Sequence, residues 1–153
     1  MTRIVAVSGG FDPLHIGHVR YFQRSRELGD RLVVILNNDN WLMKKKGFVF
    51  MPEHERKEVI EAIAGVDEVV LTDHGPDDED VSVCRALRQV RPHLFANGGD
   101  RKPDGVPVPE VPVCEELGIE MVYNMGDGGK VQSSSWLTAR LPDVDTDSKG
   151  RNL

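Results

Sequence analysis

Residues 3–38 read RIVAVSGGFDPLHIGHVRYFQRSRELGDRLVVILNN, and this stretch decides the fold. It opens and closes on short apolar runs, residues 3–8 and 31–38, of the kind that forms parallel strands buried on both faces. Between them, residues 18–30 place apolar side chains on one helical stripe and end at a Gly-Asp stop. The stripe consists of Val19, Phe22 and Leu28. The sequence therefore predicts a βαβ unit.

The alternation of strand and helix continues along the chain. Further strands are predicted at residues 67–73, 92–99 and 119–126, and further helices at residues 52–66, 81–90, 108–118 and 133–141. Because consecutive parallel strands require right-handed crossovers, this order predicts a single doubly wound three-layer α/β domain with a five-stranded parallel sheet of Rossmann-like type. The residues of the second helix expected to face the core are Val59, Ile60 and Ile63.

Length and composition limit the classes of function. The 153 residues suffice for one domain, predicted at residues 1–141, followed by a polar disordered tail at residues 142–153. A formal net charge of −6 disfavours nucleic-acid partners. No segment approaches the roughly 20 apolar residues of a membrane span, and the N-terminus has no signal-peptide core. We expect a cytoplasmic protein without a membrane partner.

Two other features have ordinary structural explanations. Cys84 and Cys114 are far apart in the sequence and belong to no CxxC motif, so we expect small buried side chains and neither a zinc site nor a redox pair. The acidic stretch at residues 73–80 does not match the spacing of a calcium loop and is expected to be solvated.

Polar loops follow four of the predicted strands, at residues 8–18, 37–47, 97–101 and 125–135. In a doubly wound sheet, ligands bind at the carboxyl ends of the strands, near the point where the strand order reverses. We therefore expect these loops to face one cleft.

The first of these loops contains two histidines at the start of a helix. His15 and His18 lie at positions i and i+3, on one side of a helical turn, and Gly17 between them permits close approach of a ligand. Two imidazoles beside the free N–H groups of a helix N-terminus form a donor-rich pocket suited to phosphate oxygens. Zinc is disfavoured, because no HExxH-like carboxylate set accompanies the histidines.

The stretch GGFDPLHIGH, residues 9–18, resembles the GxFDxxHxGH signature of the nucleotidyltransferase superfamily, in particular its cytidylyltransferase-like group. QSSSW at residues 132–136 is similar to the serine- and threonine-rich turn that precedes the last helix in this group. The resemblance spans residues 3 to about 140. ELGDRLVV, ERKEVIEAIAGVDEVV and the Gly-Gly-Asp at residues 98–100 are similar to glycerol-3-phosphate cytidylyltransferases and heptose-1-phosphate adenylyltransferases.

The resemblance implies a defined reaction. A phosphate or phosphonate oxygen of a small acceptor attacks the α-phosphorus of CTP or ATP, and pyrophosphate leaves. The protein positions the reactants and stabilises charge. The resemblance also implies Mg²⁺ bound with the triphosphate and a homodimer. Of the two reactions, cytidylyl transfer is expected slightly in preference to adenylyl transfer.

The roles of the first loop follow from the same resemblance. Gly9, Gly10 and Phe11 would form the turn against the nucleotide, while His15 and His18 would bond the α-phosphate as charge develops.

A basic run follows the second strand. Lys44, Lys45 and Lys46 precede Gly47 in what we predict to be a mobile loop, and Lys46 is the predicted contact to phosphate. An exposed, solvated loop is the alternative for this run.

Two later turns complete the predicted nucleotide site. The turn after the fourth strand would approach the base or ribose, and the serine turn would bind the β- and γ-phosphates at a helix N-terminus. The residues of these turns are Asn97, Gly98, Asp100, Ser133, Ser134 and Ser135. Weaker candidates for the acceptor are Asp12, Trp41, Lys44, Arg56, Arg101 and Lys130. Asp12 is expected to order its turn or to help hold hydrated Mg²⁺ in preference to acting as a base, and no side chain is assigned as a direct metal ligand.

Departures from the family patterns leave the substrate open. The arginine of the cytidylyltransferase RTEGISTT turn is replaced by Gly128, with Lys130 as a possible substitute, and the KGGD of heptose adenylyltransferases is NGGD here. Two other classes remain as alternatives. One is a catalytically silent nucleotide-binding module, which would be expected to lose a histidine or the serine turn. The other is an aminoacyl-tRNA synthetase fragment, which would need a KMSKS-like loop.

Overall fold

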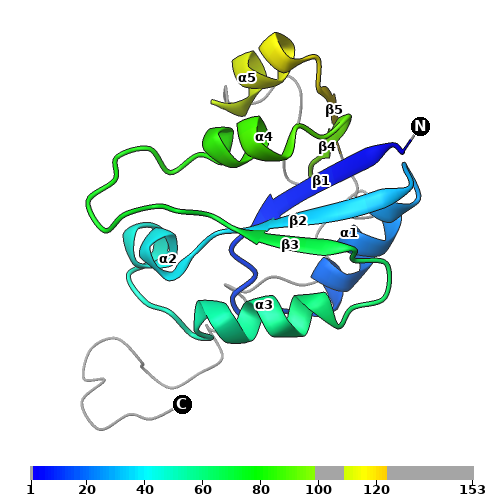
Figure 1. Ribbon diagram of the computed structural model, residues 1–153. Coiled ribbons are helices and arrows are strands. Elements are labelled where there is room, and N and C mark those ends of the chain that lie inside the picture. Colours follow the sequence, from blue (N-terminus) through cyan, green and yellow to red (C-terminus); the bar gives the residue numbers. More distant parts are fainter. Residues whose placement is uncertain (1, 99–108, 124–153) are drawn as a thin grey trace, which may run out of the picture.

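The computed structural model describes residues 2–98 and 109–123 (Figure 1). Within these ranges, five parallel strands form one sheet in the order β3-β2-β1-β4-β5. The strands are β1 (Ile4–Gly9), β2 (Arg31–Leu36), β3 (Glu68–Leu71), β4 (Leu94–Ala96) and β5 (Glu120–Val122). The helices are α1 (Ile16–Arg26), α2 (Asp39–Lys46), α3 (Glu53–Glu61), α4 (Cys84–Val90) and α5 (Glu110–Leu117). The predicted helix at residues 133–141 and the tail lie outside the described residues.

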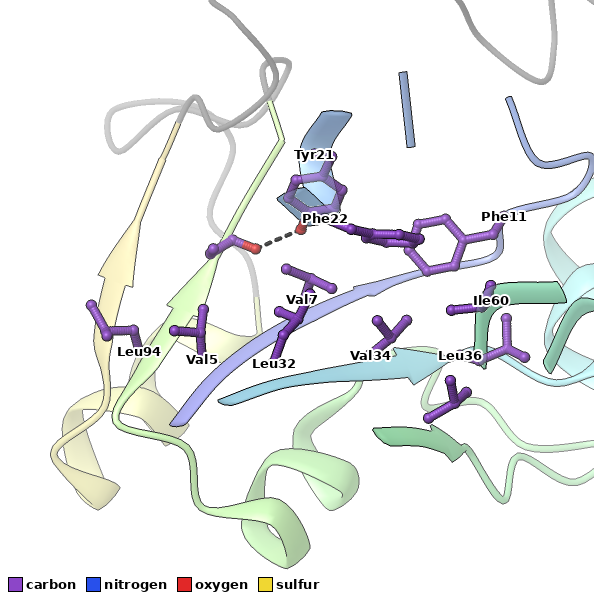
Figure 2. Close-up of a cluster of buried hydrophobic side chains, with 12 residues drawn as sticks. Val5, Val7, Phe11, Tyr21, Phe22, Leu32, Val34, Leu36, Ile60 and Leu94 are labelled. Carbon is purple, nitrogen blue, oxygen red and sulfur yellow. Dashed lines mark hydrogen bonds between the residues drawn. The ribbon is translucent and has the colours of Figure 1, made fainter. Parts of the chain in front are cut away.

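The sheet is covered on both faces, which confirms the predicted three-layer α/β fold. Helices α1 and α3 lie on one face, and α4 and α5 lie on the other (Figure 1). The larger core, drawn in Figure 2, joins Phe11, Phe22 and Ile60 to the side chains of β1 and β2. No helix in the described ranges is long and apolar enough to cross a membrane.

The strand order reverses at β1. The chain moves outward from β1 through β2 to β3, then returns to place β4 on the other side of β1. The carboxyl ends of β1 and β4 therefore border the switch point at which such sheets bind ligands. The Tyr21 hydroxyl of α1 donates to the carbonyl of Ala96 at 2.5 Å and ties the helix to the end of β4 (Figure 2).

The prediction of a loop at residues 37–47 is wrong, because most of this segment forms helix α2. Asn38 caps the start of this helix, with its Oδ1 accepting from the Trp41 N–H at 3.0 Å. The three lysines stand in the last turn, where cations complement the helix dipole. Gly47 ends the helix in the left-handed region, with φ of 83°. The lysines therefore have a fixed helical position.

Helix α3 is shorter than the predicted span of residues 52–66, and its buried face differs from the expected one. Ile60 is buried and Ile63 packs against the same core, as predicted, but Val59 is 44% exposed. Arg56 takes the buried position one turn before Ile60, because residues four apart lie on the same helical face. The prediction for Val59 is wrong because a charged residue occupies part of the stripe that faces the core.

Candidate active site

The turn after β1 is fixed by aromatic packing. Phe11 has φ of 50°, which a non-glycine residue adopts at an energetic cost, and its ring is buried. That ring makes edge contacts with His18 at 4.9 Å and with Phe22 at 5.0 Å between centroids. A Cβ at position 9 would lie 2.8 Å from the Phe11 ring, so only glycine fits there. Phe11 thus joins the turn to the core and supports the imidazole of His18.

Gly10 is required by α2. A Cβ at position 10 would lie 2.8 Å from Cζ3 of Trp41 and 3.0 Å from Cδ2 of Leu42. The Trp41 ring is itself held by a hydrogen bond from its Nε1 to the carbonyl of Val81 at 2.8 Å. The two glycines therefore allow close packing of the turn on its own aromatic ring and on α2, and Trp41 is part of that packing.

We expect Gly10→Ala to lower the free energy of unfolding by about 1–3 kcal/mol, the usual cost of overpacking. Urea denaturation of the variant beside the wild type measures this loss. Gly75→Ala is the matched control, because nothing lies within 4 Å of a Cβ at that position. We expect that control to stay within about 0.5 kcal/mol of the wild type. Equal effects at the two positions would show that Trp41 moves aside freely.

His15 and His18 cap the same helix reciprocally. Nδ1 of His15 accepts from the N–H of Gly17 at 3.1 Å, and Nδ1 of His18 accepts from the N–H of His15 at 3.3 Å. The rings stack with centroids 3.7 Å apart. Because a backbone N–H only donates, Nδ1 of each ring is unprotonated, and each neutral ring carries its proton on Nε2. Within the described residues, neither Nε2 has a hydrogen-bond partner, so the pair offers two N–H donors to a ligand.

Both imidazoles favour the neutral form. Burial lowers the pKa of His15, and the charge of Lys46 lowers it further. Burial, followed by the neighbouring His15 and Lys46, lowers the pKa of His18 to about 3. The histidines are therefore neutral donors near pH 7, and Lys46 is a charged group that acts on both of them.

The lowered pKa of His18 predicts a loss of stability in acid. A histidine whose pKa falls on folding binds its proton more readily in the unfolded chain, so its contribution disappears as the pH falls from about 6.5 towards 3. Between pH 7 and pH 5 we expect His18 to account for about 1–2 kcal/mol of lost stability. Urea denaturation at both pH values should show a smaller loss for His18→Asn. The control is His54→Asn, which removes an exposed histidine of α3 and should lose as much stability between the two pH values as the wild type. Equal losses in wild type and His18→Asn would contradict the prediction.

Lys46 is the lysine that the structure brings to the histidines. Its Nζ donates to the carbonyl of Asp12 at 3.2 Å, inside the turn that leads to His15. Burial lowers the pKa of Lys46, Asp12 raises it, and Arg56 lowers it. Lys44, Lys45 and Lys46 are all exposed side chains, and Lys46 differs from the other two by its hydrogen bond to the turn. Nζ of Lys45 lies 5.9 Å from the centroid of the Trp41 ring.

Asp12 orders the turn. Its side chain is fully buried, and its two carboxylate oxygens accept from the backbone N–H groups of Phe50 and Met51 at 2.7 and 2.6 Å. The carboxylate therefore fixes the segment between α2 and α3 against the turn. This position gives Asp12 the ordering role and not the weaker acceptor role considered from the sequence.

The side chain of Arg56 is engaged inside the protein. Its guanidinium is fully buried and donates to the carbonyls of Gly10, Asn37 and Met51 at 2.7, 2.7 and 2.8 Å. It also donates to Oδ1 of Asp39 at 2.7 Å. The interpretation of Arg56 as an anion contact is therefore replaced by an internal role.

Asn97 lies at the carboxyl end of β4, beside the end of β1 in the sheet. Its side chain is buried, and its Nδ2 donates to the carbonyls of Val122 and Phe95 at 3.2 and 3.3 Å. Gly98 follows at the end of the described segment. The remaining predicted site residues lie outside the described residues: Asp100, Arg101, Lys130, Ser133, Ser134 and Ser135.

Comparison with protein families agrees with this geometry. The model of the cytidylyltransferase-like family matches residues 6–104, which run from within β1 past β4 and include the histidine turn. The chain belongs to the cytidylyltransferase-like family.

Relatives of this cytidylyltransferase-like chain include the bifunctional protein HldE of Pelobacter propionicus, which is 36% identical over 140 residues, covering 90% of the chain and 25% of the relative. The FAD synthase of Ferroglobus placidus is 38% identical over 101 residues, covering 66% of the chain and 61% of the relative. The chain thus spans about a quarter of the length of the HldE protein that it matches.

A solved structure, that of the lipopolysaccharide core biosynthesis protein from Thermoplasma volcanium, matches with a TM-score of 0.64 at 25% identity. The match covers 81% of the chain and 97% of the solved structure. A protein of unknown function from Archaeoglobus fulgidus shares the fold with a TM-score of 0.56 at 15% identity.

Two residues of the cytidylyltransferase-like site region were not predicted from the sequence. Asp39 pairs with Arg56, and the Asn-Asp pair that directly follows a buried strand was the signal for a helix start there. His74 is buried in the acidic loop, with Nε2 donating to the carbonyl of Ser82 and Nδ1 bonded to Oγ1 of Thr72, both at 2.9 Å. No pattern in the sequence distinguished His74 from a solvated residue.

A metal ligand set is not formed by the described side chains. Residues 2–98 and 109–123 contain no group of three or more His, Cys, Asp or Glu side chains that could hold a metal ion. The carboxylate nearest the histidine turn, Asp12, is already bonded to two backbone N–H groups.

Proposed function

We propose that the chain transfers an adenylyl group from ATP to the phosphate of a small acceptor and releases pyrophosphate. The observation that carries this proposal is the pair of imidazole Nε2–H donors beside Lys46 at the carboxyl end of β1. Two neutral donors and one cation at a helix N-terminus suit a phosphate group on which negative charge develops.

The choice of adenylyl over cytidylyl transfer rests on the relatives. FAD, the product named for the Ferroglobus placidus protein, contains an AMP unit joined to a flavin phosphate. This relationship favours ATP and reverses the slight preference for CTP that the sequence alone supports.

A sugar phosphate is the acceptor class that we propose first. The similar structure from Thermoplasma volcanium is that of a lipopolysaccharide core biosynthesis protein, and polysaccharides are assembled from activated sugars. The sequence resemblance also includes sugar-phosphate adenylyltransferases. A flavin phosphate is the second acceptor to test, on the strength of the FAD synthase match.

The proposed reaction needs little proton chemistry. An ionised phosphate oxygen of the acceptor forms a bond to the α-phosphorus, and the bond from that phosphorus to the bridging oxygen of pyrophosphate breaks. Nε2–H of His15 and His18 would donate to the α-phosphate as its charge increases, and Lys46 would supply a fixed positive charge. Mg²⁺ bound to the triphosphate would neutralise the departing pyrophosphate.

Pyrophosphate release tests the proposal directly. The protein is incubated with ATP or CTP, Mg²⁺ and a panel of sugar phosphates, alcohol phosphates, a phosphonate and flavin mononucleotide. We expect release with ATP and a phosphorylated acceptor, and none above background with His18→Ala. Release with CTP alone would overturn the choice of nucleotide. Nucleotide binding, seen as a thermal shift, without release for any acceptor would favour a silent nucleotide-binding module.

We also propose that the protein forms a homodimer. Light scattering at two protein concentrations tests this proposal.

A further inference from the structure

An ion pair between Asp39, which is partly exposed, and the fully buried guanidinium of Arg56 joins three separate segments around the start of α2. Arg56 comes from α3, and its guanidinium binds the Asp39 carboxylate, the carbonyl of Gly10 after β1 and the carbonyl of Asn37 after β2. All three contacts measure 2.7 Å. The histidine turn and the start of α2 are therefore bonded to one side chain.

The two ends of α2 have different tasks. At its start, Asp39 binds Arg56 through its carboxylate, and its N–H donates to Oε1 of Glu53 at 2.8 Å. At its other end, Lys46 reaches the carbonyl of Asp12. Asp39 and Lys46 stand at opposite ends of this eight-residue helix, about 10 Å apart along its axis. A change at Asp39 therefore alters how α2 is held without removing a group that would touch phosphate.

The chemistry of Asp39 and Arg56 suits a contact that holds the start of α2 in one position. Arginine presents its N–H donors in a rigid planar fork, so Arg56 bonds acceptors in several directions at once. Asp39 also stands in the first turn of α2, where a negative charge complements the helix dipole. Lysine at position 56 would offer a single ammonium and could not reproduce this set of contacts.

We propose that Asp39 and Arg56 form a positioning pair, which sets the place at which α2 presents Lys46 to the nucleotide beside His15 and His18. This proposal rests on the proposed function, because it assigns a role within the same site. Neither Asp39 nor Arg56 is a catalytic residue in this scheme, since both act through Lys46.

A double-mutant cycle between Asp39→Asn and Lys46→Ala tests the coupling. In the chain that retains Lys46, we expect Asp39→Asn to lower kcat/KM for ATP about 10-fold, because small displacements of a positioned group are costly. In the Lys46→Ala chain, the same change should alter kcat/KM less than about twofold, because the group that it positions is gone. A similar 10-fold loss in both chains would overturn the proposal and give Asp39 a general structural role.

A matched control and a second variant separate the effect of this ion pair from a general loss of folding. Glu116→Gln removes the acid of the Arg88–Glu116 pair, which also has a 2.7 Å contact but is exposed, and should leave kcat/KM unchanged. Each variant is first checked by thermal unfolding. Should Asp39→Asn not fold, Asp39→Glu takes its place in the cycle, because it retains the charge and displaces it by one methylene group. The same non-additivity with Lys46→Ala is then expected, and additivity overturns the proposal.

An NMR titration of the Lys46 side chain separates this proposal from the proposed function. Its signal is assigned by its loss in Lys46→Ala, and its titration midpoint is compared between wild type and Asp39→Asn. A midpoint that rises in Asp39→Asn shows that Lys46 has left its place beside the Asp12 carbonyl. That rise, together with no nucleotide transfer by the wild type, would support the positioning pair and reject the proposed reaction. An unchanged midpoint would overturn the positioning pair.

Discussion

His15→Asn is expected to lower the rate of nucleotide transfer by about 100- to 1000-fold while leaving the protein folded, because it removes one donor to the developing charge. Asparagine is among the best residues for starting a helix, so its side-chain oxygen can replace Nδ1 as acceptor for the Gly17 N–H. It has no N–H group at the place of Nε2. Steady-state pyrophosphate release, measured beside urea denaturation, separates the two roles of this imidazole.

The matched variant is His15→Ala, which loses both the cap and the donor. We expect it to lose about as much rate as His15→Asn and, in addition, about 1 kcal/mol of stability. Near-wild-type transfer by His15→Asn would show that capping is the main task of His15. In that case the donor to the α-phosphate would have to be sought elsewhere.

Arg56→Met is expected to have the largest effect on stability, about 3–5 kcal/mol, because each buried acceptor that loses its donor costs about 1–3 kcal/mol and the buried guanidinium serves three carbonyls. Methionine has a similar length but no donors, so the carbonyls of Gly10, Asn37 and Met51 would lose their hydrogen bonds. The free energy of unfolding from urea denaturation at pH 7 measures the loss.

The control for this prediction is Arg88→Met, on the exposed side of α4. Arg88 makes two contacts with Glu116, at 2.7 and 3.2 Å, but both side chains are exposed. Such surface pairs contribute about 0–1 kcal/mol. A loss below about 1 kcal/mol for Arg56→Met as well would show that water replaces the buried contacts of Arg56.

The fold could be predicted because its signals are local. The apolar runs that became β1 and β2 are short, bounded by turn residues and separated by a helical pattern, and this order leaves few topologies. The histidine pair was visible for the same reason, since its spacing fixes its position at a helix start. The family match supports both interpretations.

The wrong predictions, for α2 and for the second predicted helix, have two different physical causes. The signals for α2 were present in the sequence, since Asn38 is a strong cap and Gly47 a strong stop, but the three lysines were interpreted as part of a mobile loop. The role of Arg56 had no local signal. A charged side chain is buried only when acceptors from distant segments surround it, and Gly10 and Asn37 reach it only after the sheet has formed. The exposure of Val59 follows from the same burial.

The reciprocal cap of α1 gives the two histidines a reason to persist that is independent of chemistry. A descendant that no longer handled nucleotides would still need acceptors at positions 15 and 18 to begin this helix. The two imidazoles are therefore a poor sign, on their own, that a protein of this fold still performs catalysis. A lysine carried by α2 to the Asp12 carbonyl has no such second task in starting a helix, and its presence is the more telling mark of an active site.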